Sequence, residues 1–168
     1  GKWHLGMDFP GTIGNRDWSL PVQDMPLDKG FDYFWGIPAS MNYGVLAWFE
    51  GRFAKVPPTR WTKKKSNRIA LSDYRITPPY HPEQQDDLME VAPDFGDSEC
   101  LTRFTDQAIK WIASVADDAR RGEPFFLSLP LTSPHKPVIP LEQFRGQGEA
   151  GAYGEFMIPI IGEDNRIA

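Results

Sequence analysis

The clearest pattern of apolar and polar positions lies in the second half of the chain. Apolar residues recur there at the three- and four-residue intervals of one helix face: Leu101, Phe104, Ala108, Ile112, Val115 and Ala119. Asp97 or Ser98 is placed to cap this helix by accepting the free N–H groups of its first turn. Arg120 and Arg121 complement the negative end of the helix dipole, and Gly122 follows as a stop signal. The pattern therefore predicts one amphipathic helix.

A nearly unbroken apolar run follows this helix. Residues 124–131 read Pro-Phe-Phe-Leu-Ser-Leu-Pro-Leu, which is typical of a buried strand. A helix, a short turn and a buried strand form the unit of an α/β sheet, so we predict an α/β fold. Ligands bind at the carboxyl ends of the strands in open sheets of this kind. His135, just beyond the run, is therefore a candidate site residue.

The remaining segments are less regular. Residues 1–44 are rich in Gly, Pro and aromatic residues, and predict loops and short strands. Residues 45–56 alternate around a Glu-Gly pair, which predicts a hairpin in which Gly51 supplies a positive φ. Residues 57–96 contain prolines that break any helix and predict an extended excursion. Pro159 predicts that the last helical segment kinks or ends early.

Composition excludes some classes of function. The 168 residues carry a net charge of −5, which gives no general case for nucleic acid or an anionic membrane as a partner. No stretch reaches the ~20 apolar residues of a membrane span. Cys100 is the only cysteine, so an internal disulfide is impossible, and it does not indicate a cellular compartment.

Candidate chemistry lies at three positions. Lys2 and His4 stand two residues apart, and in a strand such residues point to the same side, toward one ligand. A lysine ammonium binds sulfate or phosphate as a compact charge, and a histidine transfers protons near neutral pH. His135 follows Pro134, which restricts its backbone. On residue types alone, a surface lysine and structural histidines remain alternative interpretations.

Together these motifs resemble the type I sulfatases of the alkaline-phosphatase superfamily. Residues 1–6 read Gly-Lys-Trp-His-Leu-Gly and match a motif of that family at each position. Residues 30–36, Gly-Phe-Asp-Tyr-Phe-Trp-Gly, are similar to a second family segment. Residues 124–137 resemble the family's strand-to-histidine segment, and residues 144–155 resemble the stretch that follows. The order and spacing fit from residue 1 to about residue 158.

The resemblance implies a fold and a chemistry. It makes residues 1–168 the central part of one N-terminal catalytic domain, incomplete at both ends, within a three-layer sandwich with a mostly parallel sheet. Family members hydrolyse sulfate esters with a formylglycine nucleophile and a bound Ca²⁺. By this match Lys2 contacts the sulfate and the formylglycine, and His4 hydrogen-bonds the formylglycine hydrate and helps to release sulfate. His135 binds a sulfate oxygen and protonates the leaving alcohol.

The departures from the family pattern define what we expect outside this sequence. Cys100 does not fit the motif from which formylglycine is made, so we expect the nucleophile and most Ca²⁺ ligands outside this sequence. The expected partner of the full-length protein is a formylglycine-generating or sulfatase-maturing enzyme. We assign no metal ligand here, and Asp164 and Asn165 are not carried over. Without these groups we expect no turnover. By family habit the location is periplasmic, secreted or lysosomal, and the sequence does not choose among these.

The expected substrate is a sulfated small molecule or carbohydrate. Two alternatives stay open. One is a phosphodiester or phosphonate hydrolase of the same superfamily, and the other is a non-catalytic relative that binds sulfated glycans.

Overall fold

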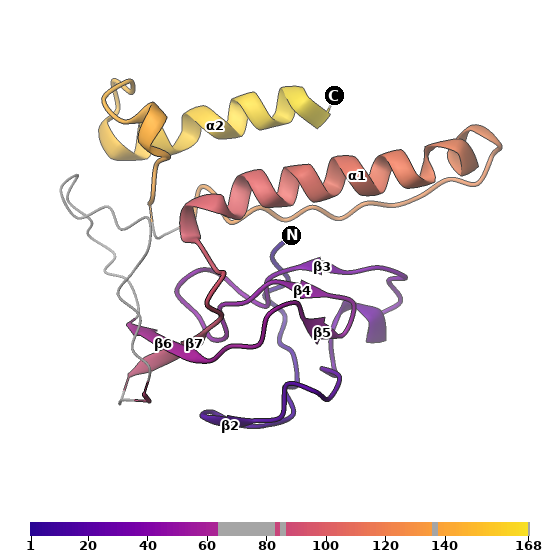
Figure 1. Cartoon of the computed structure of the whole chain (residues 1–168). Helices are drawn as coiled ribbons and strands as arrows, with labels where there is room; N and C mark the ends of the chain where they lie inside the picture. Colours follow the sequence, from indigo (N-terminus) through magenta and orange to yellow (C-terminus); the bar gives the residue numbers. More distant parts are fainter. Residues whose placement is uncertain (64–82, 85–86, 136–137, 168) are drawn as a thin grey trace.

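The computed structural model describes residues 1–63, 83–84, 87–135 and 138–167. In chain order the elements are β1 (Gly11–Thr12), β2 (Asn15–Arg16), the 3-10 helix η1 (Pro26–Asp28), β3 (Trp35–Gly36), β4 (Phe49–Glu50), β5 (Phe53–Ala54), β6 (Arg60–Lys63), β7 (Leu88–Val91), η3 (Asp97–Glu99), α1 (Cys100–Arg120), η4 (Glu142–Phe144) and α2 (Gly151–Ile167). The two long helices lie on one side of the small strands (Figure 1).

Helix α1 confirms the predicted amphipathic helix. Leu101, Phe104 and Ala108 of the predicted stripe are buried, and Gly122 follows the helix with φ +97°. The predicted side-chain cap is wrong. Asp97 begins the 3-10 helix η3 instead, and its backbone carbonyl accepts the Cys100 N–H. The start of α1 is therefore capped by a backbone turn, and not by a side chain as the sequence pattern predicted.

Strands pair only in small antiparallel sheets within the described residues. These sheets are β1–β2, β3–β4–β5 and β6–β7. The predicted hairpin is confirmed, since β4 and β5 pair across a turn in which Gly51 has φ +57°. Parallel pairing is limited there to isolated bridges, of Lys2 with Ile37 and of Leu46 with Val91. The fold is therefore mixed helix and strand as expected, but the described residues show no parallel central sheet.

The prediction of a buried strand at residues 124–131 is wrong. This segment runs back beside α1 (Figure 1) and belongs to no sheet of the described chain. Phe125 and Phe126 are 42% and 77% exposed. An apolar run specifies a preference for burial but not the strands that would cover it. Besides α1, this segment contacts the Lys2 segment, because the Lys2 N–H donates to the Pro130 carbonyl at 2.8 Å.

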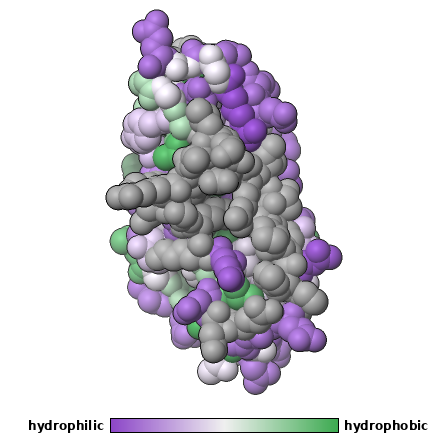
Figure 2. Space-filling view, turned by 90° about the vertical axis from the view of Figure 1, so that its left-hand side faces the viewer, coloured by the Kyte–Doolittle hydropathy of each residue, from purple (hydrophilic) through white to green (hydrophobic). Residues whose placement is uncertain are grey.

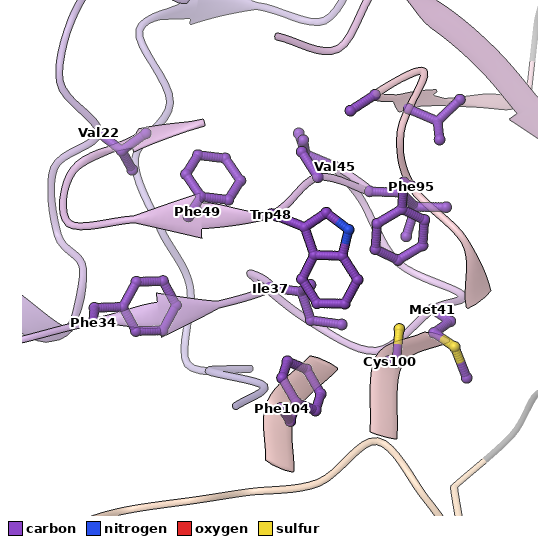
Figure 3. Close-up of a cluster of buried hydrophobic side chains, with 14 of the residues drawn as sticks. Val22, Phe34, Ile37, Met41, Val45, Trp48, Phe49, Phe95, Cys100 and Phe104 are labelled. Atoms are coloured by element: carbon purple, nitrogen blue, oxygen red, sulfur yellow. The ribbon is translucent and has the colours of Figure 1, made fainter. Parts of the chain in front are cut away.

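The core centres on Trp48, which is 1% exposed (Figure 3). Its ring stacks on Trp35 of β3 with centroids 5.0 Å apart, and it meets the edge of Phe104 from α1 at 5.7 Å. Phe95 closes the cluster at 5.2 Å. Aromatic pairs at these separations attract each other beyond their burial of apolar area. The cluster therefore fixes α1 against the β3–β4–β5 sheet.

Helix α2 continues through Pro159 to Ile167, so the expected early end is wrong. Pro159 is buried, and Phe156 beside it is 6% exposed. Both line a small cavity together with Leu101 of α1. Packing of this face against α1 offsets the cost of an interior proline, as tertiary contacts commonly do for intrinsic helix propensity.

Several exposed apolar side chains lie in loops and extended segments. Large ones are found at Leu5, Ile13, Phe125 and Phe126. On the face shown in Figure 2, hydrophilic residues predominate among the coloured residues. In the described part of the chain, no helix combines the length and the apolar character that crossing a membrane requires.

An ion pair joins the η1 helix to the β4–β5 turn. Arg52 donates to both carboxylate oxygens of Asp28, one bond being 2.9 Å, and Nη1 also donates to the Val22 carbonyl. Asp28 further accepts the Met25 N–H at 3.1 Å. The Arg52 hydrogen bond, followed by the Met25 N–H, lowers the pKa of Asp28 from 3.8 to about 2. These contacts favour the charged carboxylate in the folded state.

The first prediction concerns the core. Phe104→Ala removes a ring that is 1% exposed and leaves a cavity beside Trp48. We expect a loss of about 3–5 kcal/mol in the free energy of unfolding, measured by urea denaturation. Phe126→Ala, at a ring that is 77% exposed, is the matched control, with an expected loss below about 1 kcal/mol. Equal losses in the two variants would contradict the assigned core.

The second prediction concerns acid stability. The pKa of Asp28 is lower in the folded state, so its stabilising effect is present above about pH 4 and disappears as the pH falls through about 2. Asp28→Asn should therefore be less stable than the parent at pH 5, and this difference should shrink toward pH 2. Arg52→Gln should show the same convergence. A stability difference that is constant from pH 5 to pH 2 would rule out the assigned ion pair.

Candidate functional site

Backbone hydrogen bonds hold the first four residues between two other segments. On one side, the Trp3 N–H donates to the Ile37 carbonyl at 3.0 Å and the His4 N–H to the Pro38 carbonyl at 2.8 Å. On the other side, the Lys2 N–H donates to the Pro130 carbonyl. Residues 1–4 therefore form the central member of a three-segment arrangement, between residues 37–38 and residue 130.

Two glycines permit this close approach. A Cβ atom on Gly36 would lie 1.7 Å from the carbonyl oxygen of Gly1, and one on Gly1 would lie 2.7 Å from the Pro130 oxygen. Neither distance is compatible with a side chain unless the backbone moves. The three segments are thus packed backbone to backbone, and the glycine at position 36 is required by the position of the Lys2 segment.

Lys2 and His4 do not share the regular strand geometry that the sequence spacing assumed. Lys2 is half-buried and lines a small cavity together with Trp3, the extended segment before residue 131 and α1. His4 is exposed and has φ +66°, in the left-handed region that non-glycine residues rarely adopt. The rule that alternate residues share a side applies to extended backbone, so it does not hold at His4.

His135 lies in a turn just beyond the segment that contacts Lys2. Its N–H donates to the Thr132 carbonyl at 3.0 Å, and the preceding Ser133-Pro134 peptide bond is cis. His135 is exposed, as a residue that binds a ligand from solvent needs to be. The bond from the Lys2 N–H to the Pro130 carbonyl therefore joins the Lys2 segment to the segment that leads to His135, although Lys2 and His135 are far apart in the sequence.

The sequence pattern gave no reason to select Ser40. This serine is 1% exposed, and within the described residues its Oγ has no hydrogen-bond partner. It begins a turn, since the Tyr43 N–H donates to the Ser40 carbonyl at 2.9 Å, and the Tyr43 ring touches His4. A buried hydroxyl without a partner costs free energy, which makes Ser40 an additional candidate polar group. No sequence motif distinguishes a single loop serine of this kind.

The other chemically active side chains are placed elsewhere. Cys100 is 1% exposed at the start of α1, and its Sγ lies 3.8 Å from the Gly96 carbonyl. Asp164 and Asn165 fall in the last part of α2, where the structure describes the backbone alone. Across residues 1–63, 83–84, 87–135 and 138–167, no group of three or more His, Cys, Asp or Glu side chains is arranged to hold a metal ion. We therefore assign no metal ligand among the described residues and derive no step through a metal.

The third prediction tests the close backbone approach. Gly36→Ala places a methyl group on the Gly1 carbonyl and should displace residues 1–4, at a cost of about 1–3 kcal/mol in stability. Faster amide hydrogen exchange at Trp3 and His4 would report the displacement. The control is Gly96→Ala, whose added methyl meets the flexible Glu99 side chain at 3.1 Å. Unchanged exchange at Trp3 and His4 in Gly36→Ala would contradict this geometry.

Comparison with known proteins gives a similarity in fold. No protein-family model matches the sequence. No curated protein matches it either. A solved structure from Bacteroides thetaiotaomicron is similar over 99% of this chain, with a TM-score of 0.64 and 21% sequence identity. That protein is described as a sulfatase (6S-sulf) of a versatile core genetic locus for the metabolism of multiple glycosaminoglycans. The chain spans 38% of its length, so what the likeness shows is a sulfatase-related fold.

Proposed function

We propose that this chain forms part of the active site of a sulfatase that hydrolyses sulfate esters of carbohydrates. The observation that supports this most is the likeness of 99% of the chain to a sulfatase structure. In the same chain, backbone contacts bring the Lys2 segment next to the segment that leads to His135. We propose that the side chains of Lys2, His4 and His135 face one anion, since a lysine ammonium binds sulfate as a compact charge and a histidine can donate a hydrogen bond or a proton to it.

Each residue has a distinct role in this proposal. Lys2 places a fixed positive charge beside the sulfate oxygens, where negative charge increases in the transition state. His4 hydrogen-bonds the formylglycine hydrate and helps to release sulfate. His135 donates a hydrogen bond to a sulfate oxygen and supplies the proton that the departing alcohol needs. In this proposal the nucleophile is a formylglycine outside this sequence, because Cys100 does not fit the motif from which formylglycine is made.

A carbohydrate is the proposed partner of the sulfate group. The similar solved structure is described with the metabolism of glycosaminoglycans, which are sulfated sugars. The sequence resemblance to sulfatases agrees with that chemistry.

The fourth prediction tests the anion site by binding. The chain should bind inorganic sulfate. Isothermal titration calorimetry and the NMR amide signals of residues 2–4 would measure this binding. Lys2→Gln keeps a similar length and removes the charge, and should weaken this binding at least about tenfold, because a hydrogen bond to a charged group is worth about 1.5–3 kcal/mol. Lys110→Gln, at an exposed lysine of α1, should leave the affinity unchanged.

The outcomes separate the proposed function from its alternatives. Equal loss of affinity in both lysine variants would reduce the effect to net charge and contradict a site at Lys2. Stronger binding of inorganic phosphate or of a phosphonate than of sulfate would favour a phosphodiester or phosphonate hydrolase of the same superfamily. Binding of sulfated glycans by a longer form of the protein that shows no turnover would favour a non-catalytic binder.

A further inference from the structure

The surroundings of His4 add a residue to which the resemblance assigned no role. We propose that Tyr43 is a positioning residue that holds the imidazole of His4 in place. The two rings meet edge to face, with centroids 5.6 Å apart and planes inclined by 84°. Aromatic pairs attract each other at this separation and inclination. The inference rests on the proposed function only in that His4 then serves the sulfate site.

His4 needs such support because its backbone and its side chain are restrained very differently. The backbone is fixed, since the N–H is bonded to the Pro38 carbonyl at 2.8 Å and φ is +66°. A strained φ of this kind persists only where the surrounding structure enforces it. The side chain is exposed, and exposed side chains change rotamer within picoseconds to nanoseconds. The contact with Tyr43 restricts the two torsions that the backbone leaves free.

Tyr43 is itself held on a well-anchored turn. Ser40, Met41 and Asn42 before it are 1%, 2% and 4% exposed, so the base of the turn is buried. The Tyr43 N–H closes the turn on the Ser40 carbonyl at 2.9 Å, and Gly44 leaves it with φ +61°. Tyr43 is 49% exposed, so its ring packs on one side and faces solvent on the other. A rigid base with a ring at its tip is what positioning of a neighbouring side chain requires.

The contact between Tyr43 and His4 that the proposal uses is one of ring with ring. Tyr43→Phe should therefore preserve the position of His4, and Tyr43→Ala should abolish the restraint. Tyr153→Ala is the matched control, because Tyr153 is 50% exposed and lies in α2. Tyr43→Leu provides a second ring-free variant that keeps apolar bulk, should the alanine variant fail to fold.

Two readouts test the proposal on the 168-residue chain. The first is the ¹³C relaxation of the His4 ring without any ligand, which measures ring mobility directly. The second is the affinity for inorganic sulfate. Tyr43→Ala should raise the ring mobility and weaken sulfate binding about three- to tenfold, the range expected for ordering one flexible side chain on binding. Tyr43→Phe should stay within about twofold of the parent, and Tyr153→Ala should match it.

The results distinguish failure of this inference from failure of the proposed function. Unchanged His4 ring mobility in both Tyr43→Ala and Tyr43→Leu would overturn the positioning role. Weaker sulfate binding with unchanged ring mobility would also overturn it, because Tyr43 would then contact the anion itself. If the parent chain binds no sulfate, the proposed function fails, while the relaxation measurement still decides whether Tyr43 restrains His4.

Discussion

The packing of aromatic rings around Trp48 is the interaction on which the rest of this structure depends. Trp35 comes from the sheet and Phe104 from α1, and both rest on the same buried indole. This cluster fixes the helix against the β3–β4–β5 sheet (Figure 3). The extended chain after the helix lies along it, and Pro130 in that chain holds the Lys2 N–H. The position of the Lys2 segment thus depends on the packing of the aromatic cluster, through α1 and the extended chain that follows it.

Close backbone contact then converts this packing into a defined site. Because Gly36 leaves no space for a side chain next to Gly1, the Lys2 segment has little freedom to shift sideways. Sites built on such restrained backbone hold their functional groups more accurately than sites on loose loops. The exposed ring of His4 is the exception, and this explains why a neighbouring aromatic ring matters there.

Local sequence signals predicted local structure well. The apolar stripe gave α1, and a Glu-Gly pair at Gly51 gave the β4–β5 hairpin, because both depend on neighbours within a few residues. The prediction of a buried strand at residues 124–131 was wrong because an apolar composition indicates a preference for burial but does not specify which strands would pair with the segment. Pro159 misled because packing outweighs propensity. The sulfatase-related fold was reached through motif resemblance, and the parallel sheet expected with it does not occur in the described residues.

The candidate site also contains residues that sequence patterns did not identify. Lys2, His4 and His135 were selected by spacing and by resemblance, whereas Ser40 and Tyr43 emerge only from burial and ring contact. Neither stands in a pattern that sequence periodicity detects. Their relation to His4 is created by a turn that brings residues 40–43 beside residues 3–4.

The bond between Lys2 and Pro130 also has a kinetic meaning. It joins backbone groups that are more than a hundred residues apart in the chain, so it can form only after most of the entropy of loop closure has been lost. Contacts of such long range slow folding relative to local ones. Helix α1 and the β4–β5 hairpin need no such closure. We therefore expect the candidate site to form late in folding, so that a chain with native-like helix content can still lack it.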